Sequence, residues 1–225
     1  MRPVRHVDVA VVGSGFGGSV AALRLTEKGY RVVVVEAGAR FADHDLPRTS
    51  WDLRRFLFAP ALGCFGIQRI DLLRDVLVLS GAGVGGGSLV YATTLHRPPD
   101  AFYADPQWRG IADWRRELAG AYDRASAMLG VTPNPSTTPS DVAMHAVAQQ
   151  LGVGHTFRTA PVGVHFGEPG VAPGTEVADP YFGGAGPRRR TCVECGACMT
   201  GCRYGAKNSL PKNYLHLAEG AGAEI

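Results

Sequence analysis

The chain has 225 residues, which is enough to bury a sizeable core in one large domain or in two small ones. Hydrophobic residues make up 45% of it, charged residues 19%, and the formal net charge is only +3, so the composition excludes a strongly basic nucleic-acid-binding protein. Its 30 glycines are numerous for this length, and many are clustered where a backbone must approach another group closely. These glycine clusters are the first indication of function.

The N-terminal segment has no targeting pattern. Residues 1–6 are a short basic lead-in, and residues 7–12 already have the mostly apolar character of a buried strand. The longest other apolar stretch, residues 56–67, is shorter than a bilayer span and contains Pro60. The sequence therefore predicts a cytoplasmic location, no transmembrane segment, and a core or lid role for residues 56–67.

The first elements predict a βαβ unit. A strand over residues 7–12 leads through a glycine turn into a helix over residues 19–29, whose apolar residues recur at helical spacing. A second apolar strand over residues 32–35 follows. In a βαβ unit the two strands lie parallel to each other, which is the start of a Rossmann-like sheet.

The turn after the first strand fits the dinucleotide-binding pattern G-x-G-x-x-G. It consists of Gly13, Ser14, Gly15, Phe16, Gly17 and Gly18. The first glycine permits the tight turn, the second lets backbone N–H groups reach a pyrophosphate, and the third allows close packing of helix on strand. Glu36, with Ala37 after it, ends the second strand, where a carboxylate accepts from a ribose 2′-OH and repels a 2′-phosphate. The pattern predicts dinucleotide binding, disfavours an NADP-type ligand, and leaves a glycine turn that merely packs as the alternative.

A second glycine cluster follows a short predicted strand. Residues 39–74 have no single period, so we expect an irregular connection with a helical turn or two, and residues 75–79 predict the strand. Residues 81–92 are too rich in glycine for a strand or helix interior and would expose N–H donors with little side-chain obstruction. FAD is long and needs contacts beyond the first loop, so we expect this loop to bind FAD; a flexible surface loop is the alternative. The candidate contacts are Gly85, Gly86, Gly87, Ser88 and Tyr91.

The second half of the chain predicts two long helices, a strand and loops. In chain order these are an amphipathic helix over residues 113–129, a linker-like break over 133–139, a helix over 142–151, a strand over 156–166, a solvated loop over 168–190 and a helix over 212–220. The chain ends at Ile225, where a βαβ pattern expects the next parallel strand. We therefore expect a truncated domain.

The predicted fold class is α/β, a Rossmann-like FAD-binding domain (FAD/NAD(P)-binding fold) with the start of a substrate domain. Residues 1–132 are expected to form the first part of the FAD-binding domain. Residues 133–190 are expected to form a linker and the beginning of a substrate-domain segment. Residues 191–225 would then be a Cys-rich segment with an incomplete return to the FAD domain.

Five short stretches, together with the two glycine loops, carry a resemblance to a known family. They are RPPDAF at residues 97–102, DPQW at 105–108, MLGV at 128–131, GAKNS at 205–209 and NYL at 213–215. With them the chain resembles the GMC (glucose-methanol-choline) oxidoreductase family, and within it the cholesterol-oxidase-like branch. Ala82 stands where many relatives have Arg, and Tyr91-Ala92 stands where sterol oxidases often have Asn-Gly. These departures count against a sterol substrate, but they do not affect the prediction that the chain binds FAD.

The resemblance implies a reaction. FAD would oxidise the CH–OH group of a small-molecule alcohol, a sterol among the candidates, and oxygen or a redox partner would reoxidise the flavin. It also implies a catalytic His, with a His or Asn partner, near the C-terminus of family members. None of the histidines here, His96, His155 and His165 among them, stands in a matching motif. We assign no catalytic residue and expect the chain alone to be inactive; a non-catalytic flavin-binding or electron-transfer fragment is the alternative.

Four of the five cysteines are close together in the sequence. They are Cys192, Cys195, Cys198 and Cys202, with the C-x2-C-x2-C-x3-C spacing of a bacterial ferredoxin. Without Cys195 the spacing is C-x5-C-x3-C, which resembles the iron–sulfur motif of certain GMC sugar dehydrogenases that pass flavin electrons onward. Against a cluster, Arg203 replaces the proline usual after the fourth cysteine, and only one such run exists. An iron–sulfur cluster, a structural zinc site and reduced thiols all stay open.

Overall fold

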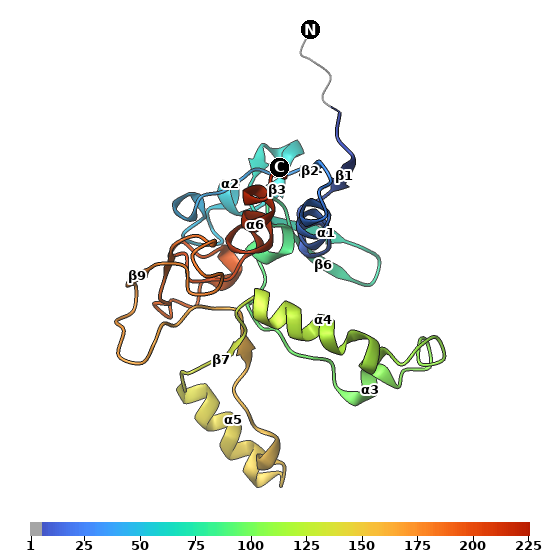
Figure 1. Cartoon of the computed structure of the whole chain (residues 1–225). Helices are drawn as coiled ribbons and strands as arrows, with labels where there is room; N and C mark the ends of the chain where they lie inside the picture. Colours follow the sequence, from blue (N-terminus) through green and yellow to red (C-terminus); the bar gives the residue numbers. More distant parts are fainter. Residues whose placement is uncertain (1–5) are drawn as a thin grey trace. The chain divides into compact units, whose positions relative to one another are not determined.

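The computed structural model describes residues 6–225, so that residues 1–5 of the basic lead-in lie outside it (Figure 1). The chain divides into two compact units. Unit 1 comprises Met1–Thr93, Met128–Gly130 and Val164–Ile225, and unit 2 comprises Thr94–Ala127 and Val131–Gly163. These boundaries differ from the predicted segments, and the functional division into an FAD-binding part and a substrate part stays a prediction.

Unit 1 begins with the predicted βαβ unit. Strand β1 (Val9–Val12) pairs in parallel with β2 (Val32–Val35), and helix α1 (Phe16–Glu27) connects them. The twelve-residue crossover is of the length that parallel pairing requires. The helix begins at Phe16 rather than at residue 19, because the glycine turn leads directly into its first turn.

A further strand position lies on the other side of β2. Glu224 pairs in parallel with Val33: its N–H donates to Val32 O at 3.0 Å, and its carbonyl accepts from Val34 N at 2.7 Å. Helix α6 (Tyr214–Gly220) precedes it and packs against α1. The predicted helix followed by a parallel strand is therefore confirmed.

Residues 39–92 pack around a small apolar core. Leu46, Ile67, Leu89 and Val90 are buried together, and Phe56 packs against them. Full burial of each such side chain contributes about 1.5–3 kcal/mol. This core joins the segment after Glu36 to the second glycine loop, and it confirms a core role for the two ends of the 56–67 stretch.

Two small antiparallel pairs lead into that loop. Strand β3 (Phe58–Ala59), after helix α2 (Leu53–Phe56), pairs with β4 (Cys64–Phe65), and β5 (Gln68–Leu72) pairs with β6 (Leu77–Gly81). Strand β6 confirms the strand predicted near residues 75–79. The irregular structure predicted for residues 39–74 is wrong at β5, because that strand is specified by pairing with β6 and has no clear hydrophobic alternation of its own.

Unit 2 contains the two long helices predicted for this half of the chain. Its elements are α3 (Asp100–Tyr103), α4 (Trp114–Met128, whose last residue belongs to unit 1), β7 (Thr132–Pro133), α5 (Pro139–Gln150) and β8 (Pro161–Val162). Helix α5 starts with a capping box in which Thr138 and Asp141 exchange hydrogen bonds. The strand predicted over residues 156–166 is wrong except at β8, whose partner β7 is only two residues long.

The loop over residues 168–190 contains one short pair, β9 (Glu176–Val177) with β10 (Arg189–Arg190). The prediction of a solvated loop is wrong at Arg189, which is 2% exposed. Its guanidinium donates to four oxygens of residues 205–208. Within residues 6–225, no helix is both long enough and apolar enough to cross a membrane.

The glycine turn supplies a stability test. A Cβ added at Gly18 would lie 1.9 Å from the carbonyl oxygen of Gly13, whereas one added at Gly17 would meet nothing within 4 Å. We expect Gly18→Ala to lower the free energy of unfolding by about 1–3 kcal/mol, because backbone must move to admit the methyl group. Gly17→Ala is the control, expected to cause no loss because alanine is the better helix former. Equal destabilisation in a denaturant titration of both variants would contradict this packing.

Candidate functional site

The N-terminus of α1 lies open beside the first glycine turn. Gly15 caps the helix without a side-chain hydrogen bond, and no acidic residue occupies the first turn. A Cβ at Gly15 or Gly17 would enter open space, whereas Gly18 packs on Gly13. The first turn of a helix carries N–H groups without intrahelical acceptors and a partial positive charge, so this end of α1 is suited to bind an anionic group such as a phosphate.

Glu36 follows β2, and its carboxylate accepts hydrogen bonds from Ser14, Gly38 and Gly83. Its Oε2 accepts from Ser14 N at 3.0 Å and from Ser14 Oγ at 2.6 Å, and its Oε1 accepts from Gly38 N at 3.0 Å. Partial burial opposes ionisation, but the hydrogen bonds from Ser14, Gly38 and Gly83 outweigh it and lower the pKa of Glu36 below its ordinary value. The carboxylate is therefore charged and fixed at the carboxyl end of the strand.

Ser14 joins the two glycine loops. Its side chain is fully buried, and while Oγ donates to Glu36 it accepts from Gly85 N at 2.9 Å. The loops also touch directly, since a Cβ added at Gly86 would lie 2.8 Å from Gly15 Cα. The structure thus brings together the residues that the sequence singled out in two stretches about seventy positions apart.

The second glycine loop is an ordered part of unit 1. Ser88 is fully buried; its Oγ donates to Gly85 O at 2.7 Å and accepts from Leu210 N at 2.9 Å. Gly85 has a φ of +108°, a left-handed conformation that disfavours any residue with a side chain. These contacts fix the loop between the first glycine turn and the segment that leads into α6.

Tyr91 closes the second loop against two other segments. Its ring meets the Phe16 ring edge-on, with centroids 5.8 Å apart, and its hydroxyl donates to Asn208 O at 3.1 Å. Burial raises the pKa of Tyr91 well above its ordinary value. The polar groups of these three side chains, Tyr91, Ser14 and Ser88, therefore form hydrogen bonds within the protein. Ala37, by contrast, is exposed. Direct contact of any of the four residues with a cofactor stays a prediction.

Three buried polar residues were not assigned to the site by the sequence. Lys207, Asn208 and Arg189 are each 2% exposed. Asn208 accepts from Arg189 at 2.6 Å through Oδ1 and donates to Leu129 O at 2.9 Å through Nδ2. Only the GAKNS stretch pointed to two of them, and it did so by family resemblance; no local pattern marks Arg189 within its run of three arginines.

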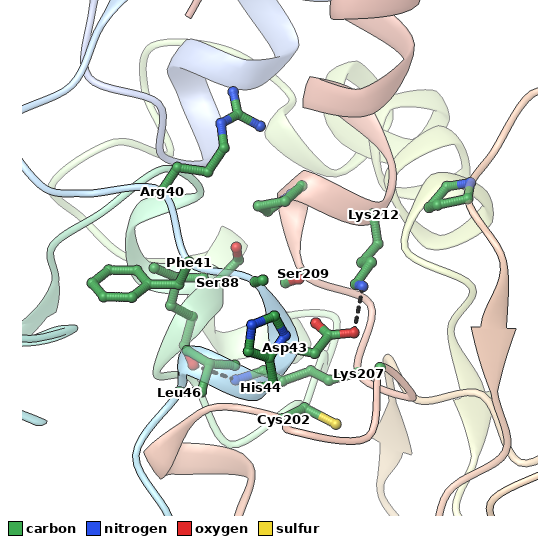
Figure 2. A pocket seen from close by; sticks show the side chains of 15 residues that line it. Arg40, Phe41, Asp43, His44, Leu46, Ser88, Cys202, Lys207, Ser209 and Lys212 are labelled. Carbon is green, nitrogen blue, oxygen red and sulfur yellow. Dashed lines mark hydrogen bonds and ion pairs between the residues drawn. The ribbon is translucent and has the colours of Figure 1, made fainter. Parts of the chain in front are cut away.

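A cavity of about 450 Å³ lies beside the second glycine loop (Figure 2). Its polar lining includes Ser88 and Lys207, and an ion pair of 2.7 Å joins Lys212 to Asp43 at its wall. Burial lowers the pKa of Lys207 to about 8, against the opposing influence of the cysteines at 198 and 202. The cavity lies within the size range of ligand-binding pockets, and it is lined on one side by the loop expected to contact the flavin.

The cysteines are unpaired, and Cys195 is exposed. Burial raises the pKa of Cys192 and of Cys198 above the ordinary thiol value, which favours their neutral forms. In the part of the chain that the structure describes, no three His, Cys, Asp or Glu side chains are arranged so that they could hold a metal ion. The arrangement therefore adds no support for a cluster at Cys192, Cys195, Cys198 and Cys202, and the cluster stays a hypothesis from spacing alone.

Comparison with known proteins identifies the relatives of this site. Residues 11–44, which hold the first glycine turn and Glu36, match the family described as NAD(P)-binding Rossmann-like domain. A cholesterol oxidase of Mycobacterium tuberculosis is 62% identical over 226 residues, which are 100% of this chain and 39% of that protein. A cholesterol oxidase of Acinetobacter baumannii is 44% identical over 218 residues, 97% of this chain and 39% of that protein. An uncharacterized GMC-type oxidoreductase of Mycobacterium tuberculosis is 30% identical over 235 residues, 99% of this chain and 31% of that protein.

Parallel strands, an open helix N-terminus and a fixed acidic residue define a Rossmann-type dinucleotide-binding domain. The chain belongs to the GMC oxidoreductase family, in its cholesterol-oxidase-like branch. It spans 39% of the length of the cholesterol oxidases that it matches. The predicted fold class and family are confirmed.

The lowered pKa of Glu36 predicts a pH effect on stability. Its carboxylate contributes fully above the unfolded value, near 4.5, and this contribution is lost as the pH falls through the lower folded-state value. Glu36→Gln keeps the shape without the charge, so its unfolding free energy should fall less steeply than that of the unsubstituted chain between about pH 6 and about pH 3.

The control is Glu27→Gln, which removes an exposed carboxylate that is paired with Arg24 on α1. Such surface pairs contribute little, so the slope should stay close to that of the unsubstituted chain. Denaturant titrations at stepped pH values measure all three proteins. An unchanged slope for Glu36→Gln would show that this carboxylate is not held as described.

Proposed function

We propose that this chain is the FAD-binding part of an oxidoreductase that oxidises the CH–OH group of an alcohol, with sterols as the first substrate class to test. The observation that carries the proposal is the contact of the two glycine loops through Ser14. One loop and a helix N-terminus suffice for the phosphates of NAD, whereas a second glycine loop fixed beside them supplies backbone for the longer FAD. The identity to cholesterol oxidases over the whole chain supports the substrate class.

Different residues of the site would bind different parts of FAD. N–H groups at the start of α1 would bind the pyrophosphate, and Glu36 would accept a hydrogen bond from the adenosine ribose. The backbone of Gly85, Gly86 and Gly87 would lie against the flavin end. When bound, FAD would supply a ring that accepts a hydride from the alcohol carbon.

The buried side chains fix that geometry. Ser14 and Ser88 hold the two loops at their separation, and Tyr91 anchors the far end of the second loop to Asn208. Because these contacts form within the protein, the binding surface is already arranged before the cofactor arrives, which reduces the ordering cost of binding. A cytoplasmic location stays a prediction from the sequence.

Flavin binding is tested with a glycine variant chosen for its open surroundings. Gly15 has ordinary backbone angles, and a Cβ added there meets nothing within 4 Å, so Gly15→Ala should fold. The added methyl group would lie where the pyrophosphate approaches, so we expect FAD affinity to fall about tenfold or more, which is about 1.4 kcal/mol. Flavin fluorescence quenching measures the dissociation constant.

The matched control is Gly110→Ala, which also enters open space but belongs to unit 2, whereas both glycine loops belong to unit 1. Its FAD affinity should equal that of the unsubstituted chain. NAD, titrated in parallel, is expected to bind more weakly than FAD. Tighter binding of NAD, or binding of neither dinucleotide by the folded chain, would refute the FAD assignment.

The acceptor is tested with the protein that carries this chain. If oxygen is the acceptor, each cholesterol oxidised should yield one ketone and one hydrogen peroxide, because two electrons and two protons pass from the alcohol to O₂. An iron–sulfur cluster at the four cysteines would instead favour a redox partner, and it predicts iron and acid-labile sulfide in anaerobically purified protein. Absence of both iron and sulfide would remove that alternative, and absence of oxidation of any sterol or long-chain alcohol would remove the substrate class.

A further inference from the structure

Lys207 carries a positive charge inside unit 1. It is 2% exposed, and its ammonium donates to Leu89 O at 2.9 Å and to Cys198 O at 2.8 Å. The nitrogen also lies 4.6 Å from the centre of the Tyr91 ring, within the range of a cation–π contact. All of these partners are neutral groups.

Arg189 is a second buried cation beside the first. Its guanidinium donates to Gly205 O, Ala206 O and Lys207 O, and to the side-chain oxygen of Asn208. One of these acceptors is the backbone oxygen of Lys207, so the two buried residues are in direct contact and form one cluster. Among the described residues, neither cation forms an ion pair with a carboxylate.

The two carboxylates whose charges act on Arg189 have other partners. Asp43 pairs with Lys212 at 2.7 Å. Asp179 accepts from the backbone N–H groups of its own loop, at Tyr181, Phe182 and Gly186 among others. A buried charge without a counter-ion is costly, and carbonyl dipoles compensate it only in part. The cluster of Lys207 and Arg189 therefore leaves a positive potential in this part of unit 1 that its surroundings compensate only in part.

Lys207 connects the cluster to the second glycine loop. Leu89, which accepts from Lys207, belongs to that loop, and Tyr91, whose ring lies near the ammonium, is its last aromatic residue. Lys207 and Ser88 both line the cavity (Figure 2). Leu89 of the same loop lines it as well. A ligand that lies along this loop would therefore experience the potential of Lys207, whose ammonium contacts the loop directly, with Arg189 behind it as a neighbour of Lys207.

We infer that Lys207, supported by Arg189, is a positioning charge that stabilises negative charge on the flavin held by the second glycine loop. The inference rests on the proposed function. A flavin that accepts a hydride gains electron density on its ring, and a fixed cation in a region of low dielectric favours that reduced form over the oxidised form. The cations would thereby raise the reduction potential of the bound flavin and assist its reduction by the alcohol.

The test uses the FAD-loaded protein at about pH 7. Lys207→Met removes the charge and keeps the length of the side chain, so the reduction equilibrium should shift at least about tenfold toward oxidised flavin, equivalent to about 30 mV for a two-electron couple. Sulfite, which adds to oxidised flavin and leaves negative charge on its ring, should bind at least about tenfold more weakly. Dye-equilibrated spectroscopic titration measures the potential, and the loss of flavin absorbance measures sulfite binding.

Two controls separate charge from packing. Lys207→Arg keeps the charge and should restore both values, and Lys28→Met removes an exposed positive charge at the end of α1 and should change neither. If Lys207→Met fails to fold, Lys207→Gln takes its place with the same expectation, since its amide can still donate to Leu89 O.

The outcomes distinguish this inference from the function on which it rests. Unchanged potential and sulfite affinity in a flavin-loaded variant overturn the inference alone. The inference is also overturned if the substitution changes only the alkylation rate of Cys198 or Cys202, because the Lys207 charge would then affect the reactivity of these thiols and not the flavin. A folded protein that binds no FAD overturns the proposed function, and this inference with it.

Discussion

The hydroxyl of Ser14 donates to Glu36 and accepts from Gly85 N–H, and the rest of the candidate site depends on this one buried group. The hydroxyl makes the largest of the hydrogen-bond contributions that lower the pKa of Glu36 despite partial burial, and it joins the second glycine loop to the first. A buried hydroxyl that lost either partner would incur a desolvation cost of about 1–3 kcal/mol. The hydrogen bonds among Ser14, Glu36 and Gly85 therefore stabilise one common arrangement of these three residues. The separation of the two loops, which sets the space for a dinucleotide, follows from that arrangement.

The electrostatics of unit 1 change from one end of the site to the other. At Glu36 a carboxylate is stabilised by N–H and O–H donors, which suits the hydroxyls of a ribose. At the start of α1 the helix dipole suits a phosphate. At Lys207 and Arg189 two cations are surrounded by carbonyl oxygens. This sequence of polarities follows the order of groups along FAD, from ribose through pyrophosphate to flavin, and so supports one extended ligand better than two separate small ones.

Local patterns made the first glycine turn, α1, β2 and Glu36 predictable, because each depends on residues within about thirty positions of one another. Strand β5 and buried Arg189 were not predictable in this way. The strand has no alternation of its own and forms only against β6, and the arginine is buried only because the carbonyls of residues 205–208 converge on it. The bracing roles of Ser14 and Ser88 were missed for the same reason: their partners lie 71 and 122 positions away.

Those separations have a consequence for folding during synthesis. The second glycine loop is held by Leu210, Lys207 and Asn208, which follow it by more than a hundred positions, and the whole of unit 2 lies between them in the sequence. Contacts so distant in sequence form late, because the intervening chain must be ordered or spanned before they close. On the ribosome, β1, α1 and β2 can therefore pair early, while the second loop stays unanchored until the GAKNS stretch has emerged. A cofactor held by that loop, as proposed, would therefore bind late in the maturation of this protein.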